Sequence, residues 1–128
     1  MSRETRHEEV RDLKVGRYVV VDGEPCKVSS LTHSKPGKHG EAKVRIEAIG
    51  LFDDKKRSAI KPASHKIEVP VVDKNAAQVL NVLGEKVQLM DMQTYETFEL
   101  PKPPEIAVSQ NMEVLYMDAM GKRKIILK

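Results

Sequence analysis

The sequence of 128 residues predicts an all-β protein made of small barrels or sandwiches. Three observations lead to this prediction. Short runs rich in Val and Ile alternate apolar and polar residues with the two-residue period of a half-buried strand. Glycine and proline residues separate these runs at close spacing, which is typical of tight turns between strands. With no Trp and only 4% aromatic residues, the core must consist mainly of Val, Ile, Leu and Met.

The first half of the chain is expected to form five short strands after a charged start. Residues 1–12 mix charges with almost no apolar periodicity, so we expect a mobile arm or a poorly packed additional strand there. Pro62 excludes a central position in a sheet for its strand, because proline cannot donate to the ladder. The five strands are expected at residues 17–21, 26–31, 42–52, 60–64 and 67–71.

A domain boundary is predicted near residue 72, which divides the chain into residues 1–71 and 72–128. By that point five strands are complete and the local charge changes sign. Residues 73–77 could start a helix, but residues 79–85 read better as a strand, and residues 105–110 could make one or two helical turns. The other strands of this half are expected at residues 86–92, 94–100, 114–117 and 124–127.

A hairpin with a long tip is predicted around the stretch Ser34-Lys35-Pro36-Gly37-Lys38-His39-Gly40. The residues that follow, 42–49, alternate small or apolar side chains with charged ones and therefore form a strand. Glycine permits positive φ and proline fixes its own φ, so the stretch suits the tip between two strands. Lys38 and His39 are expected at the apex.

The basic charge of the chain is concentrated at this hairpin. Residues 31–45 contain four basic residues and one acidic residue, a local charge of +3, so the rest of the chain sums to zero. Residues 71–121 contain three basic and eight acidic residues, and a second basic cluster lies at residues 122–128. Cations on a projecting loop favour an anionic partner such as nucleic-acid phosphates. The plain alternative is a solvated loop with ordinary lysines.

Cysteine usage and hydropathy predict a cytoplasmic protein. The single Cys26 excludes an internal disulfide framework and a zinc site made only of cysteines. No apolar run approaches the ~20 residues of a membrane-spanning helix, and the charged start is unlike a signal peptide. We expect no membrane contact. A monomer is expected, although the unmatched cysteine and an exposed strand edge would permit a dimer.

Three kinds of chemical site fit the sequence poorly. A phosphate-cradling loop needs Gly-Lys followed by Ser or Thr and a helix, whereas Gly37-Lys38 is followed by His39 and a strand. Lys38 and His39 would face water at a tip, which does not prepare them for nucleophilic catalysis, so an enzyme is not expected. A metal site would have to use four residues without the short paired spacing of structural zinc, namely Cys26, His33, His39 and His65.

Residues 34–43, which read Ser-Lys-Pro-Gly-Lys-His-Gly-Glu-Ala-Lys, closely resemble the hypusine loop of translation factor 5A. This family is the archaeal and eukaryotic relative of bacterial elongation factor P, and its pattern runs Ser-Lys-Thr-Gly-Lys-His-Gly-His-Ala-Lys. The chain departs from the pattern at Pro36 and Glu41, which affects the loop shape and local charge but not the modified lysine. The chain length, the early hairpin, the boundary near residue 72 and the strand-rich second half extend the resemblance to the whole chain.

The resemblance implies an N-terminal SH3-like barrel, residues 1–71, with the loop at about residues 32–43, and a C-terminal OB-fold, residues 72–128. It implies that Lys38 becomes deoxyhypusine or hypusine after deoxyhypusine synthase transfers an aminobutyl group from spermidine, and it implies no other cofactor. The expected partners are the ribosome and peptidyl-tRNA. There the modified side chain would promote peptide-bond formation at stalled sites, notably at consecutive prolines, and no small-molecule substrate is expected.

Other loop residues are expected to contact RNA or to support the loop, although each could be only a solvated side chain. These are Lys35, Gly37, His39, Gly40 and Lys43. Two other classes remain open: a general RNA-binding module that uses an unmodified basic hairpin, and a small ribonuclease that acts through His33 or His39. The second half has few aromatic residues for base stacking, so only weak or shape-based RNA contact is expected there.

Overall fold

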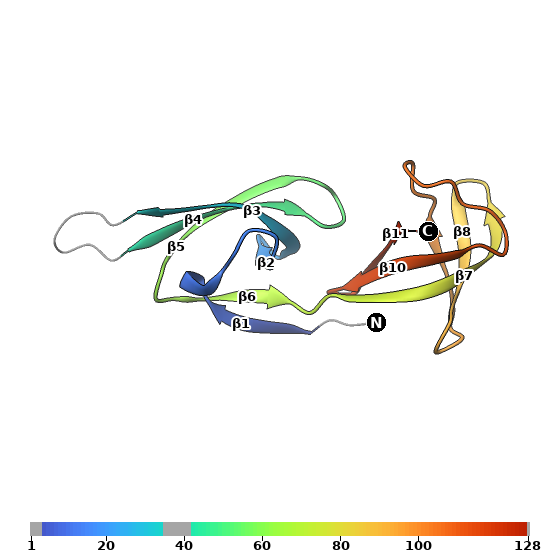
Figure 1. Cartoon of the computed structure of the whole chain (residues 1–128), viewed down its shortest axis with the longest axis horizontal. Coiled ribbons are helices and arrows are strands. Elements are labelled where there is room, and N and C mark those ends of the chain that lie inside the picture. Colours follow the sequence, from blue (N-terminus) through green and yellow to red (C-terminus); the bar gives the residue numbers. More distant parts are fainter. Residues whose placement is uncertain (1–3, 35–41, 128) are drawn as a thin grey trace. The chain divides into compact units, whose positions relative to one another are not determined.

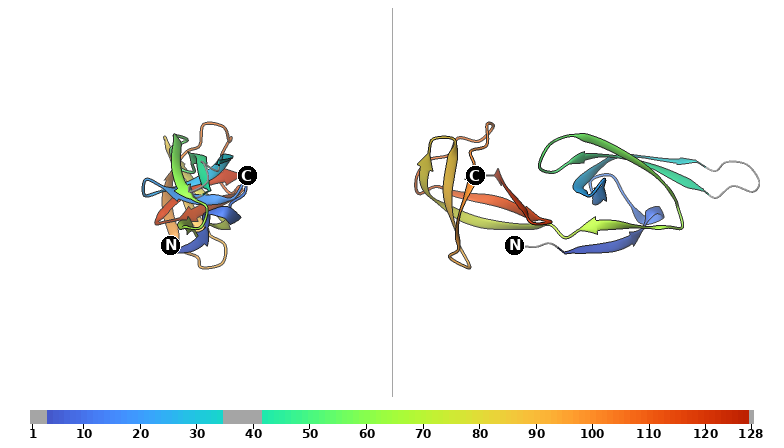
Figure 2. Two further views of the ribbon diagram at one scale, coloured as in Figure 1. Left: turned by 90° about the vertical axis from the view of Figure 1, so that its left-hand side faces the viewer. Right: turned by 180° about the vertical axis from the view of Figure 1, so that it is seen from behind.

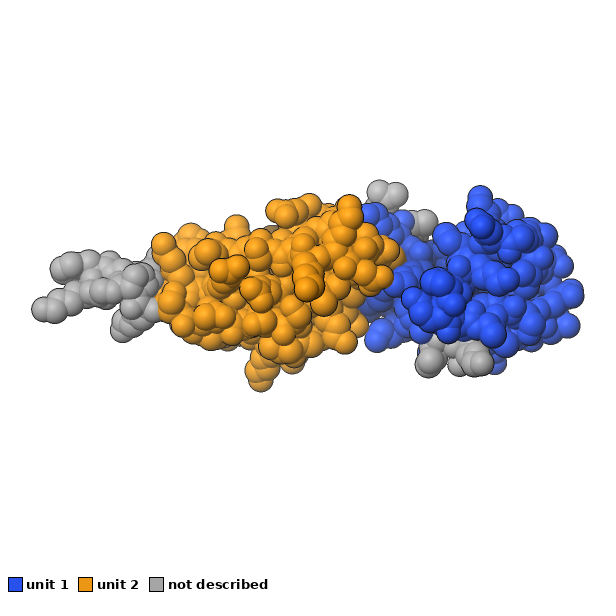
Figure 3. Space-filling view, turned by 90° about the horizontal axis from the view of Figure 1, so that it is seen from above, with its two compact units in different colours: residues 1–2, 72–128 blue, residues 3–71 orange. Residues whose placement is uncertain are grey.

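The computed structural model describes residues 4–34 and 42–127, and the regular structure of these residues is β-strand apart from one 3₁₀ turn (Figure 1). The described chain divides between Val71 and Val72 into two compact units. We call them in chain order the first unit, residues 4–71, which is orange in Figure 3, and the second unit, residues 72–127, which is blue. Each unit contains a curled antiparallel sheet around its own apolar core. The predicted all-β class, an SH3-like barrel followed by an OB-fold barrel, is confirmed.

The first unit has a four-stranded antiparallel sheet in the order β2-β3-β4-β5 and a separate two-stranded sheet, β1-β6. Asp22 and Gly23 connect β2 to β3 with φ values of 53° and 76°, the positive values that a two-residue hairpin turn of type I′ requires. The elements are β1 Thr5–Glu9, the 3₁₀ turn Val10–Asp12, β2 Tyr18–Val21, β3 Glu24–Ser34, β4 Lys43–Gly50, β5 Lys56–Pro62 and β6 Lys66–Pro70. Pro62 ends an edge strand, as its chemistry predicts.

The start of the chain is better packed than its charge pattern predicts. Strand β1 pairs along its whole length with β6, and Val10 and Leu13 are buried in the core of the first unit. The Val10 amide donates to the His65 carbonyl at 2.9 Å, and the Arg11 amide donates to the Ala63 carbonyl at 3.1 Å. Of the two alternatives for the described part of this segment, the strand is confirmed and the mobile arm is wrong. Local apolar periodicity could not decide between them, because backbone pairing with a distant segment leaves no trace in it.

The core of the first unit consists of small and branched apolar side chains. Strand β4 contributes Val44, Ile46 and Ala48, as the two-residue alternation predicts. The complete buried cluster contains Val10, Leu13, Val19, Val21, Cys26, Val28, Val44, Ile46, Ala48 and Ile67.

The second unit is a five-stranded antiparallel sheet in the order β11-β10-β7-β8-β9. Its strands are β7 Asp73–Leu83, β8 Lys86–Asp91, β9 Thr97–Pro101, β10 Glu113–Ala119 and β11 Lys122–Leu127. Strand β7 is continuous from Asp73, so no helix starts there. The core cluster contains Ala77, Val79, Val87, Leu89, Leu100, Val114, Tyr116 and Ile125.

The helical turns considered for residues 105–110 do not form. Ile106, Val108 and Met112 pack against the core from an irregular segment, and the first two have the two-residue spacing of extended chain. The Asn111 amide donates to the Val79 carbonyl and the Val79 amide donates to the Met112 carbonyl, both at 2.8 Å. Pairing with β7 therefore takes the place of helical hydrogen bonds.

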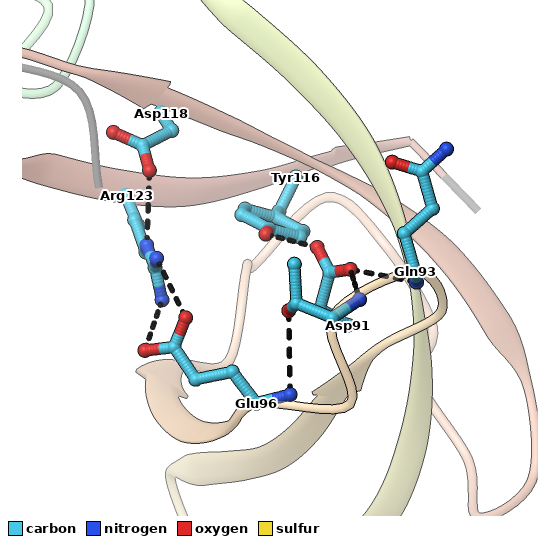
Figure 4. Close-up of polar contacts among 7 residues, drawn as sticks. Asp91, Gln93, Glu96, Tyr116, Asp118 and Arg123 are labelled. Carbon is cyan, nitrogen blue, oxygen red and sulfur yellow. Dashed lines mark hydrogen bonds and ion pairs between the residues drawn. The ribbon is translucent and has the colours of Figure 1, made fainter.

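A buried carboxylate connects β8, β10 and the turn that follows β8 in the second unit (Figure 4). Asp91 is 4% exposed and accepts the Tyr116 hydroxyl at 2.5 Å. Its other oxygen accepts the backbone amides of Gln93 and Thr94 at 2.7 and 2.8 Å. Burial alone would raise the pKa of Asp91, but these hydrogen bonds outweigh burial and lower it to about 2. The carboxylate is therefore ionised throughout the neutral range.

The Arg123 guanidinium on β11 lies 5.5 Å from the centroid of the Tyr116 ring and is fully engaged. It contacts Asp118 and Glu96, each at 3.2 Å, and its guanidinium stacks 4.5 Å from the Phe98 ring centroid (Figure 4). Burial alone would lower the pKa of Arg123, but the two carboxylates raise it, so the side chain stays cationic. The charged groups of this cluster pair with one another, and the stacking of Arg123 on Phe98 links β11 to β9.

The core assignment predicts a large difference between two isoleucines on neighbouring strands. Ile46→Ala removes a fully buried side chain from β4 and should lower the free energy of unfolding of the first unit by about 2–5 kcal/mol. Ile60→Ala is the matched control, because Ile60 on β5 is 63% exposed and its truncation should cost about 0.5 kcal/mol or less. Urea unfolding followed by NMR signals of the first unit measures both, and equal effects would contradict the assignment.

The Asp91 network predicts a pH-dependent loss of stability when its tyrosine is altered. Tyr116→Phe removes a hydrogen bond to a charged acceptor and should cost about 1.5–3 kcal/mol at pH 7. Because the native pKa of Asp91 is about 2 and lies below its ordinary value, the stabilisation is present above about pH 4 and is lost as pH falls toward 2.

The difference between wild type and Tyr116→Phe should therefore shrink in acid. Tyr95→Phe, at an exposed tyrosine of the same unit, is the control and should change stability by about 0.5 kcal/mol or less. Denaturant unfolding followed by NMR signals of the second unit, at neutral and acidic pH, gives both comparisons. A Tyr116→Phe effect that is independent of pH would show that the hydroxyl does not stabilise the carboxylate.

Candidate functional site

The candidate site is the base of the hairpin formed by β3 and β4. Their described ends are paired, Ser34 with Lys43 and His33 with Val44. Figure 1 and the right-hand view of Figure 2 show these ends extending past β2 at one end of the first unit. The strands thus fix the two positions between which residues 35–41 must run.

Five of the six residues predicted for the loop site lie outside the described residues. They are Lys35, Gly37, Lys38, His39 and Gly40. The sixth, Lys43, is exposed and is the first residue of β4.

A β-bulge at Ser29 decides which side chains of β3 face outward. Val28 pairs with Ala48, and Ser30 pairs with the preceding residue of β4, Glu47, so Ser29 is the extra residue. The bulge shifts the alternation by one position. Val28 and Leu31, three residues apart, therefore both contact the core. The same shift explains why the apolar spacing of residues 26–31 does not show the full length of β3.

Beyond the bulge, polar side chains cover the outer face of the hairpin base. Thr32 and Ser34 on β3 are exposed, as are Lys43 and Arg45 on β4, and the pairs Thr32–Arg45 and Ser34–Lys43 lie on the same face. Sequence analysis missed Arg45, Thr32 and Ser34 as site residues. The alternation of residues 42–49 carries the signal for Arg45, because side chains two apart in a strand share a face.

The cations of this face are only weakly neutralised. Arg45 contacts Glu47 at 3.5 Å, and both side chains are about half exposed, so the pair is worth at most about 1 kcal/mol. Within the described ranges, no ion pair involves Lys43. These two charges are therefore available to an anionic partner.

The outer face continues into an open hollow of about 540 Å³ on β3, β4 and β5. Arg45 and Lys56 contribute cations to its lining, and Ser29 and Ser58 contribute hydroxyl groups. The hollow brings together residues from three strands whose register is set by pairing, such as Ile49 with Lys56. Sequence analysis could not find this group, because β5 has no apolar alternation to indicate its register.

Arg57, which also lines the hollow, is tied to Asp53 by two hydrogen bonds of 3.0 and 2.8 Å. Hydrogen bonding from Arg57 lowers the pKa of Asp53, with a smaller contribution from the Lys55 amide. The pair lies over Gly50, where an added Cβ would be 2.0 Å from the Asp53 carboxylate. Arg57 is therefore committed to the fold and is less available to a ligand than Lys56.

The cysteine and histidine residues considered in sequence analysis do not assemble into a reactive site within the described residues. Cys26 is buried, and burial raises the pKa of its thiol, which makes it a poor nucleophile at neutral pH. His33 and His65 are exposed, and His39 lies outside the described residues. In the part of the chain that the structure describes, no three His, Cys, Asp or Glu side chains are placed to hold a metal ion.

The same described ranges contain no helix long and apolar enough to cross a membrane.

Comparison with known proteins identifies the family. Residues 3–65 match the family model described as translation initiation factor 5A-like, N-terminal. A translation initiation factor 5A of Thermoplasma acidophilum is 57% identical over 122 residues, which cover 94% of this chain and 95% of that protein. A protein of the same name from Methanothermobacter thermautotrophicus is 50% identical over 120 residues, which cover 92% of each chain.

Solved structures agree over nearly the whole length. The structure described as eukaryotic translation initiation factor 5A from Methanococcus jannaschii has a TM-score of 0.89 at 47% identity and covers 96% of this chain and 93% of its own. A family protein from Naegleria fowleri has a TM-score of 0.79 at 35% identity, covering 95% of this chain and 96% of its own. The chain therefore belongs to the translation initiation factor 5A family.

Proposed function

We propose that this translation factor binds the ribosome and promotes peptide-bond formation at stalled sites through a modified Lys38. Family membership supports the proposal together with one observation: the paired strands β3 and β4 hold the ends of the segment that contains Lys38. A loop whose ends are fixed loses less conformational freedom on binding.

The modification would convert a simple cation into a longer one with two nitrogens. Deoxyhypusine synthase would transfer the aminobutyl group of spermidine to the Lys38 amine. One carbon–nitrogen bond of spermidine breaks, one forms to Lys38, and diaminopropane leaves. A hydroxylation could follow and would give hypusine. Lysine contributes a flexible four-carbon stem and a compact charge, and the added group extends its reach.

The partner would be RNA at the ribosome, with peptidyl-tRNA as the group that the modified side chain reaches. Exposed Lys43 and Arg45 at the hairpin base, with Lys56 in the adjoining hollow, support this assignment because they offer cations to phosphates. Thr32 and Ser34 add hydroxyl groups that can bond to phosphate or ribose.

The role requires no chemical step by the factor itself. A side chain that orders the end of peptidyl-tRNA would lower the entropic part of the barrier to a reaction that the ribosome catalyses. On this basis we propose that the protein is not an enzyme. We also propose a cytoplasmic location for it. A general RNA-binding module would use the same hairpin base with an unmodified lysine, which makes the state of Lys38 the deciding observation.

Lys38 should carry a covalent modification in its native host. Protein purified from its native host should carry the mass of an aminobutyl group, with or without one added oxygen, on the peptide that contains Lys38. Intact-mass and peptide mass spectrometry measure this directly. An unmodified Lys38 in a host that contains deoxyhypusine synthase would contradict the proposal.

Replacement of Lys38 by arginine separates the effect of charge from that of modification. Lys38→Arg keeps a positive charge but cannot accept the aminobutyl group, so it should reduce stimulation of peptide-bond formation on polyproline templates to the level without factor. Lys43→Arg is the matched control, because it makes the same replacement at an exposed hairpin residue and should keep the stimulation. Full stimulation by Lys38→Arg would instead favour the unmodified RNA-binding module.

A further inference from the structure

The turn between β8 and β9, residues 92–96, carries an exposed aromatic side chain on an unfavourable backbone. Tyr95 is 70% exposed and has φ of 61°, in the left-handed region that glycine and asparagine adopt more easily. A tyrosine there costs about 1 kcal/mol or more. Among the described residues, no ring contact or side-chain hydrogen bond involves Tyr95. Packing of its ring within the described fold therefore does not offset the backbone strain.

Hydrogen bonds hold this turn in one conformation. The Asp91 amide donates to the Glu96 carbonyl at 2.9 Å, and the Tyr95 amide donates to the Asp91 carbonyl at 3.0 Å. The Asp91 side chain is bonded to Tyr116 on β10, and the Glu96 side chain is bonded to Arg123 on β11 (Figure 4). Both ends of the turn are thus anchored to neighbouring strands. A ring presented in this way is already ordered, which reduces the entropy lost on binding.

A second exposed apolar side chain lies three residues before Tyr95. Met92 is 42% exposed, and its amide is fixed to the Ala76 carbonyl at 3.0 Å. Tyrosine and methionine are both enriched at the centres of protein interfaces, where aromatic anchors contribute most of the binding energy. The turn thus exposes two side chains of the kinds found at such centres.

The charge around the turn favours a basic partner over RNA. Residues 91–99 contain three carboxylates and no basic residue. Asp91 is buried and bonded to Tyr116, and Arg123 neutralises Glu96, which leaves Glu99 on β9 as the exposed carboxylate of this stretch. Carboxylates repel a phosphate backbone and attract a basic protein surface.

We propose that the β8–β9 turn is a docking site for a basic protein surface, with Tyr95 and Met92 at its centre and Glu99 on its rim. The site rests on the proposed function, because the partner it fits is a basic protein component of the ribosome. A nucleobase stacked on Tyr95 is the competing outcome.

Site-directed crosslinking tests which class of molecule meets the turn. The full chain carries the photoreactive residue benzoylphenylalanine in place of Tyr95 and is irradiated with purified ribosomes of the host. We expect a crosslink to ribosomal protein. A crosslink to ribosomal RNA alone would overturn the proposal.

A second position keeps this result separate from the proposed function. The same residue placed at Lys43 reports ribosome contact by the hairpin. Crosslinks from position 43 without any from position 95 would overturn the docking site and leave the proposed function standing. No crosslink from either position would contradict both.

Variants distinguish a docking residue from a structural one. Tyr95→Asn suits the left-handed backbone, so stability should stay equal or rise, while affinity for purified ribosomes should fall about tenfold. Tyr95→Phe keeps the ring and should bind within about twofold of wild type. Lower stability of Tyr95→Asn with unchanged affinity would overturn the proposal.

Reversal of the charge at Glu99 distinguishes the two kinds of partner, because it should change ribosome affinity in opposite directions. Glu99→Lys should weaken ribosome binding if the partner surface is basic, and should strengthen it if the partner is RNA. Binding measured at two salt concentrations checks that the effect is electrostatic, since screening should reduce it. Tighter binding by Glu99→Lys would overturn the proposed partner.

Discussion

The antiparallel ladder between β3 and β4 is the constraint on which the first unit depends. Strand β4 is central in its sheet, between β3 and β5, and its inward residues form the middle of the core. The ladder runs from the pair Cys26–Gly50 to the pair Ser34–Lys43. It therefore joins the core to the ends of the segment that contains Lys38. The bulge at Ser29 lets β3 reach the loop and still bury an apolar side chain near its end. It brings Leu31 back to the core face while Thr32 remains outward.

The ladder was predictable in part, and the unpredicted part has a physical cause. Clean alternation over residues 42–49 identifies β4 and its core residues. The bulge interrupts the alternation in β3, so local periodicity ends the strand too early. Backbone pairing with β6 organises the charged start, although its side chains show no apolar pattern. Residues 105–110 contain weak helical signals that pairing of the neighbouring Asn111 and Met112 with β7 overrides.

The candidate site, like the fold, could be predicted from the sequence only in part. The tip residues could be named from a motif, and Lys43 is where the alternation places it, but the hollow that joins Arg45 to Lys56 depends on register between strands. The Asp91–Tyr116 bond joins residues 25 positions apart and has no local sequence signal. The two units also differ in charge, since residues 1–71 sum to +4 and residues 72–128 to −1. We propose RNA contact at the basic hairpin and protein contact at the β8–β9 turn, beside the exposed Glu99.

Amide hydrogen exchange across the β3–β4 ladder tests the central structural claim most directly. If the ladder holds the segment between Ser34 and Lys43 at fixed ends, the amides bonded across it at Thr32 and Arg45 should exchange within about tenfold of those at Lys27 and Ile49. NMR of the full chain resolves these positions separately. Exchange at the rate of an unstructured peptide beyond Leu31 would contradict the account, because the strands would then not position the loop.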